Sequence, residues 1–453
     1  MIDLDRELRD YAELMEQAMG PIHVEAFRAV KPPRRRPNRR GLAVALAAAA
    51  IMVLVITAVV ILDPFGSEGP FIEEPTTIPT TTPSVTEAVP PTTTTVVEDT
   101  TMTTITAPVV PVITWERVFT SFDAIHAVAL VEGGFIAVGG DEVADAAIWR
   151  SSDGVAWERI AGDDAVFGGE GAQYGYEVAA RGDVIVVVGT AGSSGDERPL
   201  AWTSVDTGET WQRIELEGTG RAWAVAVTDD RFVAGGDGIW TSGDGVDWRP
   251  VADDAGAFGI VSIAHSERGF VAVGNSDNQA AVWTSQDGEV WQRVPYDDDL
   301  FGVPIHQLTA GSTWINDVIA TPDGFVAVGV SRDKPTVWTS LDGYNWSRTP
   351  NQPSAKGGYQ PITAITQAGN MLIAVGFHQI SPQVAVGGPR QAALAWISHD
   401  NGQSWRAPTD EGSAFGPIQG EIYPIDVVAD GTRLVAVGYR NDEGAVWTAT
   451  IEH

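Results

Sequence analysis

The chain has 453 residues with 60 acidic and 28 basic side chains, no cysteine and a formal net charge of −32. This charge disfavours nucleic acid as a partner, because phosphates attract Lys and Arg. The lack of cysteine excludes disulfides and thiolate zinc sites, and the length exceeds what one small core needs.

The first 20 residues carry apolar side chains at helical spacing, which predicts a short amphipathic helix. Two interpretations remain open for this helix. It could dock on a cytosolic partner, or it could be a frayed helix without one, because isolated helices of this length are marginal in water. The apolar positions are Leu4, Leu8, Tyr11, Met15 and Met19.

Residues 41–62 form an uncharged apolar segment of 22 residues. As a helix it would reach about 33 Å, enough to cross the hydrocarbon of a bilayer. Six Lys or Arg residues lie directly before it within residues 31–40, and none follows until Arg117. The positive-inside rule predicts a single-pass signal anchor of the plasma membrane, with residues 1–40 cytoplasmic and the remainder outside. A cleaved signal peptide is the alternative, but no Ala-x-Ala site follows the segment.

Residues 63–112 contain nine Pro, many Thr and no basic residue. The segment has neither the two-residue period of a strand nor the 3.6-residue period of a helix. This composition predicts a disordered extracellular stalk that could carry O-linked glycans. Fully extended, it would hold the following domain up to about 150 Å from the membrane.

The rest of the chain repeats one unit seven times. An apolar strand such as GFVAVG is followed by a strand such as AVWTS, and short alternating strands lie before and after this pair. The Trp residues of the AVWTS-like strands are separated by 38 residues (Trp202 to Trp240) to 58 residues (Trp338 to Trp396). Four short strands at this period predict an all-β, seven-bladed β-propeller, an architecture of the WD-like repeat kind.

The two ends of the repeat region complement each other. The last repeat ends in AVWTATIEH and lacks a fourth strand, whereas ITWERV at residues 113–118 resembles a fourth strand without a repeat of its own. We therefore expect the N-terminal strand to complete the seventh blade, because this pairing leaves no open sheet edge. The propeller is predicted to occupy residues 113–453.

A Ser-x-Asp turn closed by Gly and Trp joins the third and fourth strands of six repeats. Ser204, Asp206, Gly208 and Trp211 give its full form. The motif resembles the Asp box, or BNR repeat, of sialidases, sortilin-type receptors and several non-enzymatic propellers. We expect its carboxylates to accept backbone N–H bonds within the turns, since six evenly spaced catalytic groups would make little sense. They are Asp153, Asp206, Asp244, Asp287, Asp342 and Asp400.

The face opposite these turns carries the longer loops, and the resemblance implies that this loop face binds ligands. Long loops are expected at residues 295–313 and 378–391. Counting back from each second strand places equivalent inner positions at His126, Tyr176, Trp223, Val261, Asn316 and Thr363. Rim side chains could stack on a sugar or peptide, and ordinary filling of the channel is the alternative. The candidate ligand-binding residues are His126, Tyr174, Tyr176, Arg221, Trp223, Trp314, Asn316, Arg332 and Arg390.

The resemblance to sialidases also implies a glycosidase alternative. Such an enzyme needs an Arg cluster, a Tyr–Glu nucleophile pair and an acid/base Asp, and the Arg-Ile-Pro signature is absent. Tyr174 or Tyr176 could pair with Glu170 or Glu177, but we assign no catalytic residue on this ground.

The sequence therefore favours a membrane-anchored bacterial surface propeller that binds a glycan, peptide or cell-envelope partner without catalysis. The alternative is a sialidase-like exo-glycosidase, and a third hypothesis is a transmembrane sensor that reports through residues 1–20. No cofactor and no metal site are expected, although acidic pairs such as residues 410–411 leave Ca²⁺ as an alternative.

Overall fold

The structure is a computed structural model that describes residues 112–452, apart from 122, 161–163, 253–255, 257–258, 277–278, 302–312, 354–358, 380–390, 408–414, 416–420 and 442. The described residues fall within one compact unit, Thr94–His453. The predicted amphipathic helix, membrane segment and nearly all of the stalk lie outside them. Within the described part, no helix has the length and apolarity that crossing a membrane requires.

The strands form seven sheets, here called blades 1 to 7 and given from the channel outward. Blade 1 is β2 (Ala124–Val131), β3 (Gly134–Gly140), β4 (Ala146–Ser151) and β5 (Glu158–Arg159). Blade 2 is β6 (Ala172–Arg181), β7 (Val184–Gly192), β8 (Arg198–Ser204) and β9 (Gln212–Glu215). Blade 3 is β10 (Ala222–Val227), β11 (Phe232–Gly236), β12 (Ile239–Ser242) and β13 (Trp248–Pro250). Blade 4 is β14 (Ile260–Ser266), β15 (Gly269–Ser276), β16 (Gln279–Ser285) and β17 (Trp291–Arg293).

Blade 5 is β18 (Thr313–Thr321), β19 (Gly324–Ser331), β20 (Lys334–Ser340) and β21 (Trp346–Arg348). Blade 6 is β22 (Ile362–Ala368), β23 (Met371–Gln379) and β24 (Gln391–Ser398). Blade 7 is β25 (Ile422–Asp430), β26 (Arg433–Arg440), β27 (Glu443–Glu452) and β1 (Val112–Ser121). Two single-turn helices, α4 (Asp164–Phe167) and α5 (Asp298–Phe301), follow the fourth strands of blades 1 and 4.

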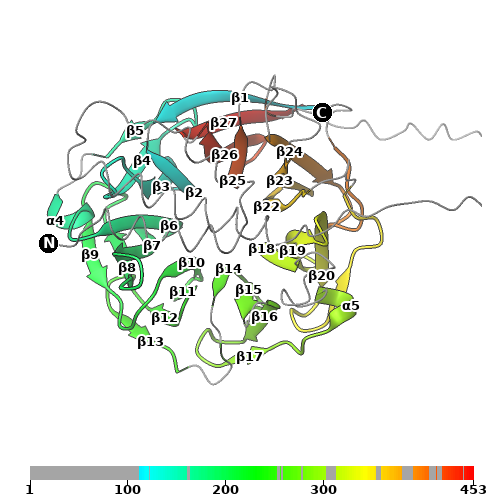
Figure 1. Ribbon diagram of the computed structural model, residues 1–453, viewed down its shortest axis with the longest axis horizontal. Coiled ribbons are helices and arrows are strands. Elements are labelled where there is room, and N and C mark those ends of the chain that lie inside the picture. Colours follow the sequence, from blue (N-terminus) through cyan, green and yellow to red (C-terminus); the bar gives the residue numbers. More distant parts are fainter. Residues whose placement is uncertain are drawn as a thin grey trace, which may run out of the picture. The chain divides into compact units, whose positions relative to one another are not determined.

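The blades follow one another in chain order around a central channel (Figure 1). Their first strands line the channel and contact one another around the whole ring, including β25 with β2. This arrangement confirms the predicted all-β, seven-bladed propeller. Blade 6 differs in its outer edge, where a single bridge between Ile397 and Arg406 stands in place of a described fourth strand.

The N-terminal strand closes the ring as predicted. In Figure 1 the cyan β1 lies beside the red β27, with Ile113 opposite Ile451 and Trp115 opposite Ala449. Trp115 also stacks on Phe415, with the ring centroids 4.7 Å apart. The strand β27 is therefore not left as an open edge, and the last blade has four strands like most of its neighbours.

Continuous apolar runs in the second strands reflect burial on both faces. All eight residues of β19 are buried, because neighbouring blades cover each face of the sheet. The Trp residues of the third strands fill the space between blades, and each is at most 2% exposed. They are Trp149, Trp202, Trp240, Trp283, Trp338, Trp396 and Trp447.

The six turn carboxylates accept hydrogen bonds inside their own turns. In blade 3, Asp244 Oδ1 accepts the N–H groups of Val246 and Asp247 at 2.8 and 2.9 Å and the Ser242 hydroxyl at 3.1 Å. The bonds from the two N–H groups are the largest causes that lower the pKa of Asp244. The pKa is likewise lowered at Asp153, Asp206, Asp287, Asp342 and Asp400.

The glycine of each turn sets the turn against the preceding blade. Gly343 of blade 5 has a φ of 80°, in the left-handed region that favours glycine. A Cβ atom there would lie 2.6 Å from Cγ2 of Val271 in blade 4. The Trp346 indole N–H donates to the Gly343 carbonyl at 2.7 Å and fixes the turn. The motif thus joins blades as well as strands.

Candidate binding site in the central channel

A β-bulge interrupts the first strand of every blade at an equivalent position. A bulge adds one residue to one strand of the pair, so the alternation of faces shifts there. All seven bulged residues line one cavity of about 320 Å³ in the channel, and in blades 2, 4, 5, 6 and 7 the next residue lines it as well. The bulged residues are His126, Tyr176, Trp223, Val261, Asn316, Thr363 and Ile425.

The polar side chains at three bulges tie neighbouring blades together. Each donates a hydrogen bond to the carbonyl oxygen that precedes the bulge of the next blade. His126 Nδ1 must carry its proton, because a backbone carbonyl can only accept. For these three side chains the structure supports a role in filling and joining the channel wall. The bonds are His126 Nδ1 to Gly175 O (2.8 Å), Asn316 Nδ2 to Ile362 O (2.7 Å) and Thr363 Oγ1 to Pro424 O (2.7 Å).

Three carboxyl groups, Glu177, Asp317 and Asp426, follow the bulges of blades 2, 5 and 7 and line the same cavity. Burial is the main cause that raises the pKa of Asp317 to about 7 and that of Asp426 to about 6. Burial, and then the charge of Asp426, raise the pKa of Glu177 well above its ordinary value. The channel therefore concentrates acidic groups that are costly to ionise.

Two of these carboxyl groups also connect blades. Asp317 Oδ2 accepts the N–H of Ile365 in blade 6 at 2.9 Å, and its Oδ1 accepts the Ser262 hydroxyl of blade 4 at 2.7 Å. Asp426 Oδ2 accepts the N–H of Val128 in blade 1 at 2.8 Å. Asp317 and Asp426 were not among the predicted site residues. The signal that could have found them is an acid directly after an inner position whose counterparts elsewhere are Ala or Ser.

Aromatic rings form an arc along one side of the channel, from blade 7 through blade 1 to blade 3. Tyr176 stacks on Trp223 with ring centroids 4.3 Å apart, and His126 lies 5.4 Å from Tyr176. Tyr174 and Tyr439 lie 6.0 and 6.3 Å from the His126 ring. We call Tyr439, His126, Tyr174, Tyr176 and Trp223 the aromatic arc. Tyr439 was not among the predicted residues, because it lies on the second strand of blade 7, whereas the predicted inner positions lie on first strands.

An arginine caps the arc at the rim. The Arg221 guanidinium lies 5.1 Å from the centroid of a Trp223 ring and donates from Nη2 to Glu197 Oε1 at 2.7 Å. Burial raises the pKa of Tyr176 to about 12 and also raises that of Tyr174, so both phenols stay protonated at neutral pH. Their hydroxyl groups can therefore donate to a ligand.

The structure brings six of the nine predicted ligand-binding residues to the channel, namely His126, Tyr174, Tyr176, Arg221, Trp223 and Asn316. Among the described residues, Trp314 makes no ring contact with the arc. Arg332 lies in the turn after β19, where its charge is the second cause, after burial, that lowers the pKa of Arg348. Arg390 falls outside the described residues.

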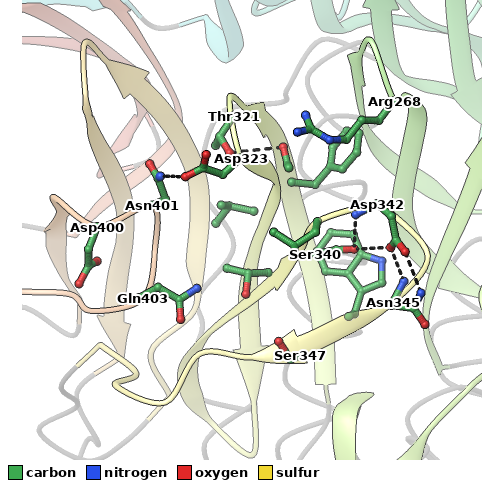
Figure 2. Close-up of a pocket in the computed structure, with 16 residues that line it drawn as sticks. Arg268, Thr321, Asp323, Ser340, Asp342, Asn345, Ser347, Asp400, Asn401 and Gln403 are labelled. Carbon is green, nitrogen blue, oxygen red and sulfur yellow. Dashed lines mark hydrogen bonds between the residues drawn. The ribbon is translucent and has the colours of Figure 1, made fainter.

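Two wider grooves, of about 730 and 710 Å³, lie on the turn face, and Figure 2 shows the larger one beside blades 5 and 6. Its acids are already engaged. Asp342 bonds within its own turn, and Asp323 accepts the Asn401 amide. Arg268 donates to the Pro322 carbonyl at 3.1 Å. The groove is larger than the channel cavity, but it exposes few polar groups that are free to meet a ligand.

No group of three His, Asp or Glu side chains in the described part of the chain could hold a metal ion. The acidic pair at residues 410–411, which left Ca²⁺ as an alternative, lies outside the described residues.

The family model described as "DUF6242 beta propeller domain" matches residues 152–448. No curated protein matches the chain. Among solved structures, a catalytically inactive virginiamycin B lyase from Staphylococcus aureus with quinupristin has a TM-score of 0.51 at 9% identity, covering 75% of this chain and 99% of that one. This likeness supports the propeller fold and, at such low identity, nothing further.

Two other solved structures are similar at a TM-score of 0.49. The GH74 enzyme from Niastella koreensis is 12% identical over 72% of this chain and 52% of that one, so the chain spans about half of the enzyme's length. YCF48 from Cyanidioschyzon merolae is 15% identical over 74% of this chain and 98% of that one.

Proposed function

The chain belongs to the family of DUF6242 β-propeller domains, and we propose that it is a non-catalytic binding module for a glycan, peptide or cell-envelope partner. Residues 41–62 anchor it in the plasma membrane, and residues 63–112 form a stalk that displays the propeller outside. The apolar length of the first segment and the basic residues before it support this orientation.

The observation that carries the proposal is the stacked pair Tyr176 and Trp223 in a channel cavity of about 320 Å³. Binding sites for small groups are concave, lined by aromatic side chains and equipped with a few polar groups. Asn316 and Ser262 line the same cavity, and Arg221 adds a charged group over the Trp223 ring. A cavity of this size accommodates one sugar unit or one side chain of a larger partner.

The sialidase-like alternative has weaker support. Its substrate carboxylate calls for several convergent arginines, whereas in the described residues Arg221 is the arginine at the arc and is already paired with Glu197. Glu177 and Tyr176 both line the cavity, yet no hydrogen bond joins them among the described residues. Glu177 Oε1 instead accepts the N–H of Val178 at 2.9 Å.

The proposal is tested by screening the full-length protein in detergent against glycan and peptide arrays. The affinity of each hit is then measured for the unaltered protein and for the Trp223→Ala variant. We expect the variant to bind at least tenfold more weakly, because stacking on an aromatic face is lost. The matched control is Leu341→Ala, whose side chain is 76% exposed in a turn on the opposite face. Equal loss in both variants, or hits that are unaffected by Trp223→Ala, would place binding elsewhere. Turnover of a fluorogenic sialoside would instead favour the enzyme.

A further inference from the structure

We propose that the channel cavity receives an aliphatic ammonium group, such as a lysine side chain or an amino sugar carries. This inference deepens the proposed function, because it names the chemistry that the same site recognises. It rests on the composition of the cavity wall, on an unused carboxylate oxygen and on the position of the aromatic rings.

The cavity wall carries acidic groups without a basic counterpart. Glu177, Asp317 and Asp426 come from three different blades, and none of the described residues that line the cavity is Lys or Arg. Arg221 at the rim is held by Glu197 and by the face of Trp223. These half-buried carboxyl groups are costly to ionise without a cation, so a bound cation would stabilise the ionised form.

One carboxyl oxygen of Glu177 accepts no hydrogen bond from the described residues. Asp317 and Asp426 use both of their oxygens to accept hydrogen bonds from the wall. Glu177 Oε1 accepts the Val178 N–H, whereas no described residue donates to its Oε2. An ammonium group has three donors to offer, and a bond to an ionised acceptor is stronger than a neutral one.

The aromatic arc supplies the remaining walls that such a cation requires. The Trp223 ring already meets Tyr176 and the Arg221 guanidinium, whereas Tyr176 lines the cavity next to Glu177 and its ring face carries the negative end of the quadrupole. A desolvated ammonium group is attracted to such a face. His126 does not oppose it, because burial lowers the pKa of this ring and keeps it neutral.

An organic cation fits this cavity better than a metal ion does. The described residues contain no set of His, Asp or Glu side chains placed to coordinate a metal. The carboxyl groups lie on separate blades around a cavity of about 320 Å³. They therefore suit a polyatomic ligand better than a single ion.

The test is isothermal titration of the full-length protein in detergent with pairs of probes that differ in charge. Nα-acetyl-lysine amide is compared with neutral Nα-acetyl-norleucine amide, and glucosamine with N-acetylglucosamine. We expect one charged member to bind at least tenfold more tightly than its neutral partner. Glu177→Gln should remove that preference, whereas Glu170→Gln, an exposed acid before the same strand, should keep it.

Each outcome decides the question. A preference for the lysine probe assigns a basic peptide, and a preference for glucosamine assigns an amino sugar. Equal binding of charged and neutral members, or binding of the neutral members alone, overturns the inference and leaves the proposed binding function standing. If none of the four probes binds but array hits depend on Trp223, the inference is also overturned and the proposed binding function still stands. Because the comparison of probes uses the unaltered protein, it holds even if Glu177→Gln fails to fold.

Discussion

Asp426 Oδ2 accepts the backbone N–H of Val128 at 2.8 Å, which joins the last blade of the propeller to the first inside the channel. At the outer edge, β1 joins the same two ends of the chain by pairing with β27. Closure of the ring therefore has two parts, one inside the channel and one at the outer edge of blade 7. Both depend on residues that are far apart in the sequence.

Removing β1 should open the ring. A chain that starts at residue 122 leaves the edge of β27 unpaired and exposes Trp447, and open edges pair with other chains. We expect such a truncation to lose cooperative unfolding or to aggregate, as measured by thermal unfolding and light scattering. A truncation that starts at residue 94, the first residue of the compact unit, is the control and should unfold like the full-length protein. A stable monomer without β1 would contradict the closure argument.

The turn motif allows a comparison within one turn. Asp244→Ala removes the acceptor of two backbone N–H groups and should lower the free energy of unfolding by about 1–3 kcal/mol. Asp247→Ala, three residues further along, changes an exposed side chain and should cost less than about 0.5 kcal/mol. Chemical denaturation of both variants measures the difference. Equal costs would show that the carboxylate is not what holds the turn.

The turn glycines allow conformational strain to be separated from contact. Gly431, with a φ of 61°, has open space where a Cβ atom would lie, so Gly431→Ala should cost about 1 kcal/mol from the backbone alone. Gly343→Ala adds a clash with Val271 in the preceding blade and should cost clearly more. Denaturant midpoints of the two variants make the comparison. If Gly343→Ala is no worse than Gly431→Ala, the blades adjust without cost.

The sequence was sufficient to predict the propeller, because the repeat fixes strand order and the orphan strand fixes closure. It was less informative about the channel. Strict alternation would place Asn316 and Asp317 on opposite faces of β18, yet the bulge turns both toward the cavity. Bulges leave no mark in the alternation of a single strand, and for this reason Asp317 and Asp426 were missed. Tyr439 was missed because it lies on the second strand of its blade, β26, whereas the predicted inner positions lie on first strands.

The channel acids predict an unusual dependence of stability on pH. The pKa of Asp317 is about 7 and that of Asp426 about 6 in the folded protein, against an ordinary 3.8. At pH values between about 4 and these raised pKa values, the folded state holds protons that the unfolded chain has released. The free energy of unfolding therefore falls as pH rises from about 4 to about 7. The slope is at most about 1.4 kcal/mol per pH unit for each titrating group. His126 acts in the opposite sense below pH 6.5, because burial lowers its pKa.

The turn aspartates limit stability on the acid side. Asp206 and Asp342 have pKa values of about 2, so their contribution is complete above about pH 4 and is lost as pH falls toward 2. Together the two sets place the maximum of stability well on the acidic side of neutrality, near pH 4.

Thermal unfolding at a series of pH values checks this prediction. The variant in which Glu177, Asp317 and Asp426 become the corresponding amides should show a smaller fall, or none, in melting temperature from pH 5 to pH 7.5. Its melting temperature should also exceed that of the unaltered protein most at the upper end of that range, because the amides cannot ionise. Asp247→Asn, which changes one exposed acid, should leave the profile of the unaltered protein intact. Parallel profiles for the amide variant and the unaltered protein would mean that the channel acids do not titrate in this range.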